Sequence, residues 1–282
     1  MSDPAPSSKS TRLKGFDASL RARWIEAPHA PVDGDFLHEA FLIPDGWLQG
    51  RSLFGGLTAA ALAALASKHV DAGRTLRSAS IQLLRPTRPG PAMGKLRIVR
   101  EGRTTTFAQA ILVQHDEETA LASFVFTAPH PTATAIAGPP AFVGPTADSL
   151  EDLSYVPGLF PEFTQHVAMR WAQGAPPYSG AETAHFDGYC RFRIPAGGAE
   201  GVLGLLDMWP CPSLSVLREP RAASTVTWSA HIAAIPANFE QWFSFSYDTI
   251  VGTEGFHVAA GHLHAADGTY VGFTEQLVAI FE

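Results

Sequence analysis

The stretch that decides the fold is "RSLFGGLTAAALAALASKHV", which runs from Arg51 to Val70. Two glycines, Gly55 and Gly56, follow an aromatic residue, and an almost uninterrupted run of Ala and Leu comes after them. Ala and Leu are strong helix formers, and glycine permits a tight turn into the helix. A helix that is apolar on all its faces has to be buried on all of them. The rest of the chain must therefore wrap around this helix.

The residues that follow supply the wrapping. Four runs that are β-branched or alternate in polarity are separated by turn residues, and these runs are residues 75–86, 94–102, 104–116 and 119–129. A consecutive antiparallel sheet that curls around the helix lets each bury the apolar face of the other. Residues 31–50, before the helix, also alternate and predict an early strand or two.

The last hundred residues repeat this order. Residues 188–195 predict a strand and residues 197–210 a Gly-opened apolar helix, and four strand runs follow at residues 223–236, 240–251, 255–268 and 269–282. Asp267-Gly268 is a strong hairpin signal between the last two runs. The repetition indicates a tandem duplication of one α+β unit.

The chain therefore divides into two expected units. We expect the first unit at residues 1–130, including a loose tail over about the first 15 residues, and the second at residues 181–282. Residues 131–180 are rich in Pro, Ala, Gly and Thr and predict a linker, although the aromatic segment 158–174 is expected to be docked rather than free.

Composition limits the classes of function. With 282 residues, 46% of them apolar and 17% charged, the chain can bury a large core and is not of the disordered class. A net charge of −7 argues against nucleic acid as the main partner. Two cysteines, Cys190 and Cys211, make neither a disulfide framework nor a zinc site by themselves. No apolar signal segment or membrane-length run is present, so we expect a cytoplasmic protein with no membrane span.

Short motifs occur in the same order in both halves. The first half contains "GRSLFGGLTAAALAAL", "SASIQLLRPTRPG" and "EGRTTTFAQAILVQ", and the second contains "LLDMWP", "STVTWSAHI" and "HLHAADGTYVGFTEQ". With their order and spacing, these motifs resemble those of the double-hotdog acyl-CoA thioesterase II family, over about residues 35–130 and 188–282. The resemblance implies a tandem double hotdog, in which each antiparallel sheet wraps around a central apolar helix, and hydrolysis of fatty acyl-CoA to free acid and CoA.

The resemblance also implies the catalytic group. That family uses an Asp, a Thr or Ser and a Gln, all from the C-terminal hotdog, to hold and polarise a water without forming an acyl-enzyme. Carried onto this sequence, these residues are Asp207, Thr225 and Gln276. Two departures stand beside them: Thr227 occupies a position where some relatives carry an acidic residue, and Glu275 directly precedes the proposed Gln.

The residue types suit the chemistry. Thioester hydrolysis needs an aimed water, a group that takes its proton, and donors for the developing oxyanion. A buried Asp can be the base, a Thr hydroxyl can hold the water, and a Gln amide both donates and accepts. Taken alone, Asp207 can equally be a solvated helix end, Thr225 an ordinary strand residue and Gln276 a solvent-facing one. We expect Gly55 and Gly56 to serve helix packing first, although amides at a helix start can also bind a thioester oxygen.

Two other functions stay open at this point. A hotdog hydratase or dehydratase would need a His–carboxylate pair at the site, and His185 in "HFDG" and His257 are the candidates. A non-catalytic acyl-CoA-binding protein would be favoured if Asp207 pointed to solvent. His262 and His264 share one strand face, as metal ligands can, but no carboxylate or Cys stands at supporting spacing.

The expected partner is an acyl-CoA substrate, with the acyl chain between helix and sheet. The chain contains no Gly-x-Ser-x-Gly elbow, P-loop or dinucleotide fingerprint, and we expect no cofactor and no metal. Arg85, Arg88 and Arg103 are candidates for contact with the CoA phosphates, without an assignment among them. The two sheets are expected to pair as a pseudo-dimer, and the chain to form a homo-oligomer.

Overall fold

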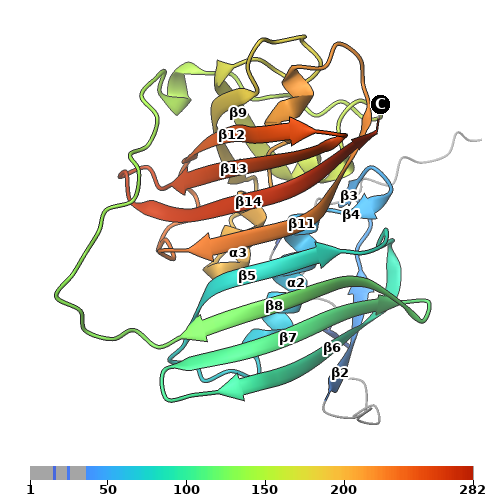
Figure 1. Cartoon of the computed structure of the whole chain (residues 1–282), viewed down its shortest axis with the longest axis vertical. Coiled ribbons are helices and arrows are strands. Elements are labelled where there is room, and N and C mark those ends of the chain that lie inside the picture. Colours follow the sequence, from blue (N-terminus) through green and yellow to red (C-terminus); the bar gives the residue numbers. More distant parts are fainter. Residues whose placement is uncertain (1–14, 17–23, 26–35, 282) are drawn as a thin grey trace, which may run out of the picture.

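The computed structural model describes residues 15–16, 24–25 and 36–281. Apart from Gly15, the predicted N-terminal tail lies outside these described residues. The strands form one 12-stranded antiparallel sheet in the order β1-β2-β6-β7-β8-β5-β11-β14-β13-β12-β10-β9. The first half of the chain therefore occupies one half of the sheet and the second half of the chain the other (Figure 1).

The elements follow the expected order in both halves. Those of the first half are β1 (Trp24–Ile25), β2 (Leu37–Ile43), β3 (Leu48–Gln49), β4 (Ser52–Leu53), α2 (Gly55–Ser67), β5 (Thr75–Leu83), β6 (Gly90–Glu101), β7 (Thr105–Gln114) and β8 (Glu117–Thr127). Those of the second half are β9 (Val167–Gly174), β10 (His185–Phe192), α3 (Gly198–Leu206), β11 (Ala222–Ile232), β12 (Phe243–Thr253), β13 (Phe256–His264) and β14 (Tyr270–Phe281). Strands β3 and β4 form a separate hairpin.

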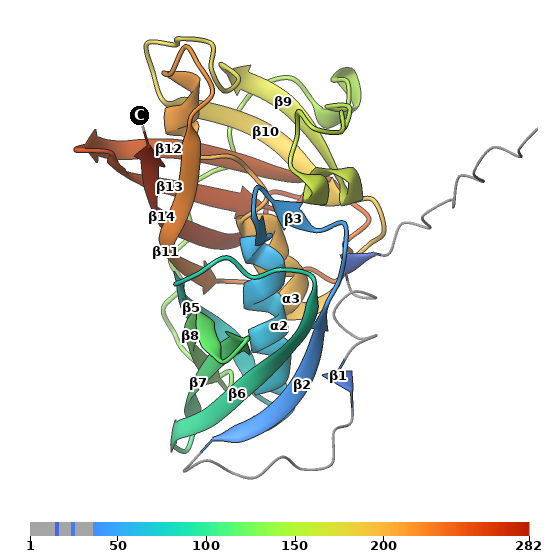
Figure 2. The ribbon, with the colours of Figure 1, turned by 90° about the vertical axis from the view of Figure 1, so that its right-hand side faces the viewer.

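The two halves join edge to edge. Strand β5 pairs with β11, from Thr227 opposite Gln82 to His231 opposite Ser78. The continuous sheet curves around α2 and α3, which lie side by side on its concave face (Figure 2). The sequence repeat thus produces two wrapped helices that share one sheet.

Helix α2 is buried on every side because it has neighbours on every side. All its residues from Gly55 to Ala66 are buried except Ala64. The sheet covers one side, and α3 covers the other at very close range: a Cβ added to Gly56 would lie 3.1 Å from the Cα of Gly204. Glycines at both positions permit this approach of the two backbones. This explains a helix with no polar face in the sequence.

The segment predicted to be a linker contains more structure than expected. Strand β9 lies within residues 131–180 and pairs with β10 at the edge of the sheet. The residues before β9 are also tied to the sheet, since the Tyr189 hydroxyl donates to the carbonyl of Pro145 and the Arg170 guanidinium donates to Asp152. Proline-rich composition thus identified a connection but not the strand at its end. No helix in the described part of the chain is long and apolar enough to cross a membrane.

Candidate active site

The three residues carried over from the family resemblance lie in direct contact. The Thr225 hydroxyl donates to Oε1 of Gln276 at 2.8 Å, and Nε2 of Gln276 donates to Oδ1 of Asp207 at 2.8 Å. Both hydrogen bonds are of normal length. The Gln276 amide is therefore fixed at both its atoms, and the three side chains form one hydrogen-bonded chain that ends on a carboxylate.

A β-bulge brings Thr225 into this chain. Along β11, Trp228 faces the concave side, where its indole N–H donates to Thr274. Strict alternation would then turn Thr225 outward, because successive side chains point to opposite faces. The register between β11 and β14 shifts between Thr225 and Thr227, so Thr225 pairs with Val278 and points to the same face as Gln276. A bulge re-aims a side chain in this way.

Asp207 is buried at an unfavourable position for a negative charge. It is only 7% exposed and forms the C-terminal cap of α3, the negative end of that helix. Burial raises the pKa of Asp207 from 3.8 to about 7, against the opposing effect of hydrogen bonds from Gln276 and the Gly56 amide. The carboxyl group is therefore poised to exchange a proton near neutral pH.

The first half of the chain contributes to this site. The N-terminal cap of α2 is Phe54, whose side chain makes no capping hydrogen bond. The Gly56 N–H donates instead to Asp207, so a carboxylate from the second half satisfies the positive end of the helix in the first half. A Cβ added to Gly55 would lie only 2.6 Å from Oδ2 of Asp207. The two glycines thus serve the carboxylate as well as the packing role predicted for them.

The His–carboxylate pair named for a hydratase exists, but on the other face of the sheet. His185 lies 2.8 Å from Asp248 and 3.1 Å from Asp187; burial is the largest single effect and lowers the pKa of its imidazole, but the two carboxylates together raise that pKa above its ordinary value. Side chains alternate along β10, and Phe186 packs on Trp209 at the α3 side. His185 therefore points away from the Asp207 side.

The remaining candidates do not form a reactive centre. His262 is bonded to the Tyr270 hydroxyl and His264 to the carbonyl of Pro139. His264 is 1% exposed, whereas His262 is partly buried. The described residues contain no group of three His, Cys, Asp or Glu side chains placed to hold a metal. Cys190 is a buried free thiol whose burial raises its pKa to about 12.

The sequence matches two family profiles, one for each half. Residues 43–127 match the profile of the acyl-CoA thioesterase N-terminal domain, and residues 137–280 match that of the acyl-CoA thioesterase C-terminal domain. No curated protein sequence matches the chain.

Solved structures with the same fold cover nearly the whole chain. A hot dog fold protein of unknown function from Alicyclobacillus acidocaldarius is 20% identical, covers 89% of this chain and 95% of its own, and has a TM-score of 0.78. The tesB protein of Mycobacterium avium subs paratuberculosis is 17% identical, and the match covers 95% of this chain and 98% of the tesB chain with a TM-score of 0.73. An acyl-CoA thioesterase II, TesB2, from Mycobacterium marinum is 14% identical, and the match covers 90% of this chain and 95% of the TesB2 chain with a TM-score of 0.70.

These structural matches confirm the expected α+β hotdog fold. The two profiles confirm the family resemblance, and the larger one alone spans half of the chain. The chain belongs to the acyl-CoA thioesterase family and is a thioester hydrolase.

Proposed function

We propose that this protein hydrolyses acyl-CoA to a free acid and CoA with a water activated by Asp207 and held in place by Thr225 and Gln276. The observation that carries the proposal is the hydrogen-bonded chain of these three side chains, which ends on a buried carboxylate with a raised pKa. A hydroxyl, an amide and a base in contact are the groups that an attacking water requires.

Each step balances with the groups present. Asp207 accepts a proton from the water as the water oxygen attacks the thioester carbonyl carbon. The tetrahedral intermediate collapses, the carbon–sulfur bond breaks, and the proton held by Asp207 passes to the leaving sulfur. A carboxyl group with a pKa close to the working pH suits both transfers. A substantial fraction of it is ionised and can accept the proton of the water, and its protonated form is acidic enough to donate that proton to the leaving sulfur.

The start of α2 supplies the electrostatic part of the mechanism. Gly55 and Gly56 form its positive end, and this end lies directly beside the Asp207 carboxylate. An oxyanion that forms next to Asp207 therefore develops within the field of the helix dipole, beside a carboxyl group that is only 7% exposed. In this mechanism the first hotdog supplies positive potential and the second supplies the base.

The test is release of free thiol from a panel of acyl-CoA substrates. Asp207→Asn keeps the size of the side chain and removes the base, so we expect its kcat to fall at least about a hundredfold. Asp248→Asn is the matched control, since this carboxylate lies on the outer face beside His185, and we expect its rate to equal that of the wild type.

Any of three results would reject the mechanism. Wild-type activity in Asp207→Asn would remove the base assignment. A wild-type protein that binds acyl-CoA without releasing thiol would support the non-catalytic alternative, and activity lost only in Asp248→Asn would direct attention to His185. The cytoplasmic location and the homo-oligomer stay predictions.

A further inference from the structure

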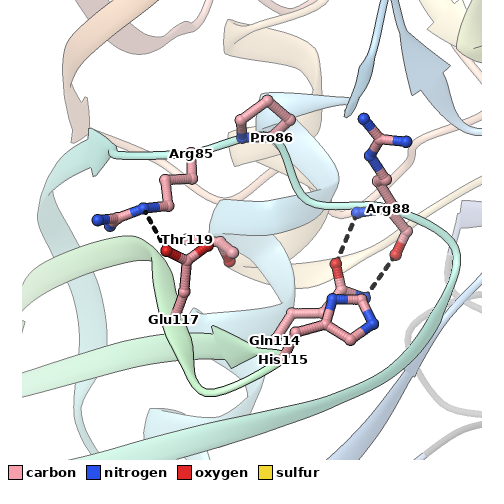
Figure 3. Close-up of a pocket in the computed structure, with 7 residues that line it drawn as sticks. All are labelled: Arg85, Pro86, Arg88, Gln114, His115, Glu117 and Thr119. Atoms are coloured by element: carbon pink, nitrogen blue, oxygen red, sulfur yellow. Dashed lines mark hydrogen bonds and ion pairs between the residues drawn. The ribbon is translucent and has the colours of Figure 1, made fainter.

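A hollow lies on the surface where β5 leaves the sheet. Arg85 and Arg88 lie on one side of it, and Gln114 and Glu117, at the turn between β7 and β8, lie on the other (Figure 3). Its volume is about 260 Å³. The side chains of the two arginines extend to opposite sides of Pro86, which lies between them in the chain (Figure 3).

This hollow lies at the same end of β5 as the candidate active site. The ladder between β5 and β11 ends at Gln82 and Thr227, two residues from Thr225, while the next residues stay bonded to β8 as far as Arg85, whose N–H donates to the carbonyl of Thr119. Leu83 packs beside the start of α2, with its Cδ1 3.6 Å from where a Cβ on Gly55 would lie. Arg88 is five residues beyond Leu83, which a chain can span in at most about 18 Å.

The backbone of this loop is fixed. The Arg88 N–H donates to Oε1 of Gln114, and Nε2 of Gln114 donates back to the carbonyl of Arg88. The Leu53 N–H, just before α2, donates to the carbonyl of Thr87. The loop is therefore tied both to the floor of the hollow and to the strand that leads into the active site, and the position of its arginines is set in advance of any ligand.

The guanidinium groups remain available. No hydrogen bond or ion pair joins the Arg88 guanidinium to another residue in the described part of the chain. Arg85 lies 3.4 Å from Glu117, in an ion pair whose side chains are 50% and 63% exposed, and its Nη1 also donates to the backbone carbonyl of Glu118 at 3.1 Å. Exposed pairs of this kind are weak, so an incoming anion can take the place of Glu117. Arg51, in the turn between β3 and β4, is a third exposed cation at the same end of α2.

We infer that the Arg85–Arg88 hollow binds the phosphate groups of CoA, an inference that rests on the proposed hydrolysis of acyl-CoA. The phosphates are separated from the thioester by the whole pantetheine arm, so the groups that bind them must lie outside the buried site, along a path from it. Guanidinium groups bind phosphate oxygens through two parallel hydrogen bonds. In a chain with a net charge of −7, such local cations determine where a polyanionic substrate binds.

Arg103, which the sequence presents as an equal candidate, lies at the opposite end of α2. The Arg74 guanidinium, which follows the end of α2, donates to the carbonyls of Gly102 and Arg103. Helix α2 has 13 residues, which correspond to a length of about 20 Å. Arg103 is therefore an exposed arginine in a second hollow, remote from Asp207, and serves as the matched control.

The experiment compares kinetics on two substrates with the same acyl group. For acyl-CoA, we expect Arg85→Ala and Arg88→Ala each to raise KM about tenfold with little change in kcat, because a charge-assisted hydrogen bond to phosphate is lost. We expect Glu117→Gln to lower KM about twofold, since it removes the competing carboxylate. Arg103→Ala should leave KM unchanged. With an S-acyl pantetheine that carries no phosphate, the differences in KM should disappear.

Binding of free CoA, measured by calorimetry, separates this inference from the proposed function. If the wild type binds CoA and Arg88→Ala weakens that binding about tenfold, the hollow is supported even if thiol release is not observed. If acyl-CoA is hydrolysed and Arg85→Ala and Arg88→Ala behave as Arg103→Ala does, the hollow is rejected and the hydrolase assignment stands. Equal losses on acyl-CoA and on the acyl pantetheine would also reject it, because they would indicate damage to the site itself.

Discussion

Replacement of the Asp207 carboxylate is expected to lower kcat at least about a hundredfold and to change how stability depends on pH. Folding raises the pKa of this group from 3.8 to about 7, which corresponds to about 4 kcal/mol of unfavourable free energy when the group is fully ionised. Well below pH 3.8 both the folded and the unfolded forms hold the proton, and the full stability is present. As pH rises to about 7, the unfolded form loses its proton first, so the free energy of unfolding falls.

Asp207→Asn has no proton to lose and escapes this penalty. Asn also turns an N–H₂ group toward either Gly56 or Gln276, both of which donate, and this mismatch costs about 1–3 kcal/mol at every pH. The absolute difference between the two proteins therefore depends on that constant cost. The change of this difference with pH does not depend on that cost. Relative to the wild type, we expect the free energy of unfolding of Asp207→Asn to rise by about 2–3 kcal/mol between pH 5 and pH 8.

Urea denaturation of both proteins at pH 5 and pH 8 measures this change. The exposed Asp116, in the turn between β7 and β8, provides the control variant Asp116→Asn, which tests for a general effect of removing one charge. If the free energies of unfolding of wild type and Asp207→Asn change in parallel between the two pH values, Asp207 has no raised pKa. The account of it as a base poised near neutrality would then be refuted.

Three further predictions concern the same contacts. The kcat/KM of the wild type for acyl-CoA should rise with pH and level off above about 7 as Asp207 loses its proton, and a profile flat from pH 5 to pH 9 would contradict this. Gly55→Ala should lower kcat about tenfold or more, because its Cβ would lie 2.6 Å from Oδ2 of Asp207 and would displace that carboxylate. An unchanged rate of thiol release would show that the position of the carboxylate does not limit catalysis. Thr225→Val should lower kcat about tenfold and leave Oε1 of Gln276 without its donor, whereas Thr225→Ser should restore the rate, and failure of Ser to do so would mean that the methyl group rather than the hydroxyl matters.

The sequence alone determined the architecture. The run from Gly55 to Ser67 has no polar face, and such a helix requires partners all around it, which the following strand patterns supply. The same order of elements in the second half predicted a second wrapped helix. Turn residues located most strand ends to within a few positions. Strand β9 was the exception, because a short edge strand within a proline-rich connection gives only a weak local signal.

The residues of the candidate site were readable only through the family resemblance. By residue type and spacing, Asp207 can be a solvated helix end and Thr225 an ordinary strand residue. The side of the sheet to which Thr225 points depends on a bulge, and one extra residue in a strand reverses the face of every residue beyond it. No local pattern in "STVTW" predicts that extra residue.

Only the tertiary structure decided how the two halves meet. Local sequence preferences fix helices, strands and turns, because they act between residues that are close in the chain. The contact between Gly56 and Asp207, the pairing of β5 with β11, and the separation of Arg88 from Arg103 along the length of α2 join residues far apart in the sequence. Burial at that junction gives the carboxylate its raised pKa, and burial is a property of the packed molecule rather than of any segment.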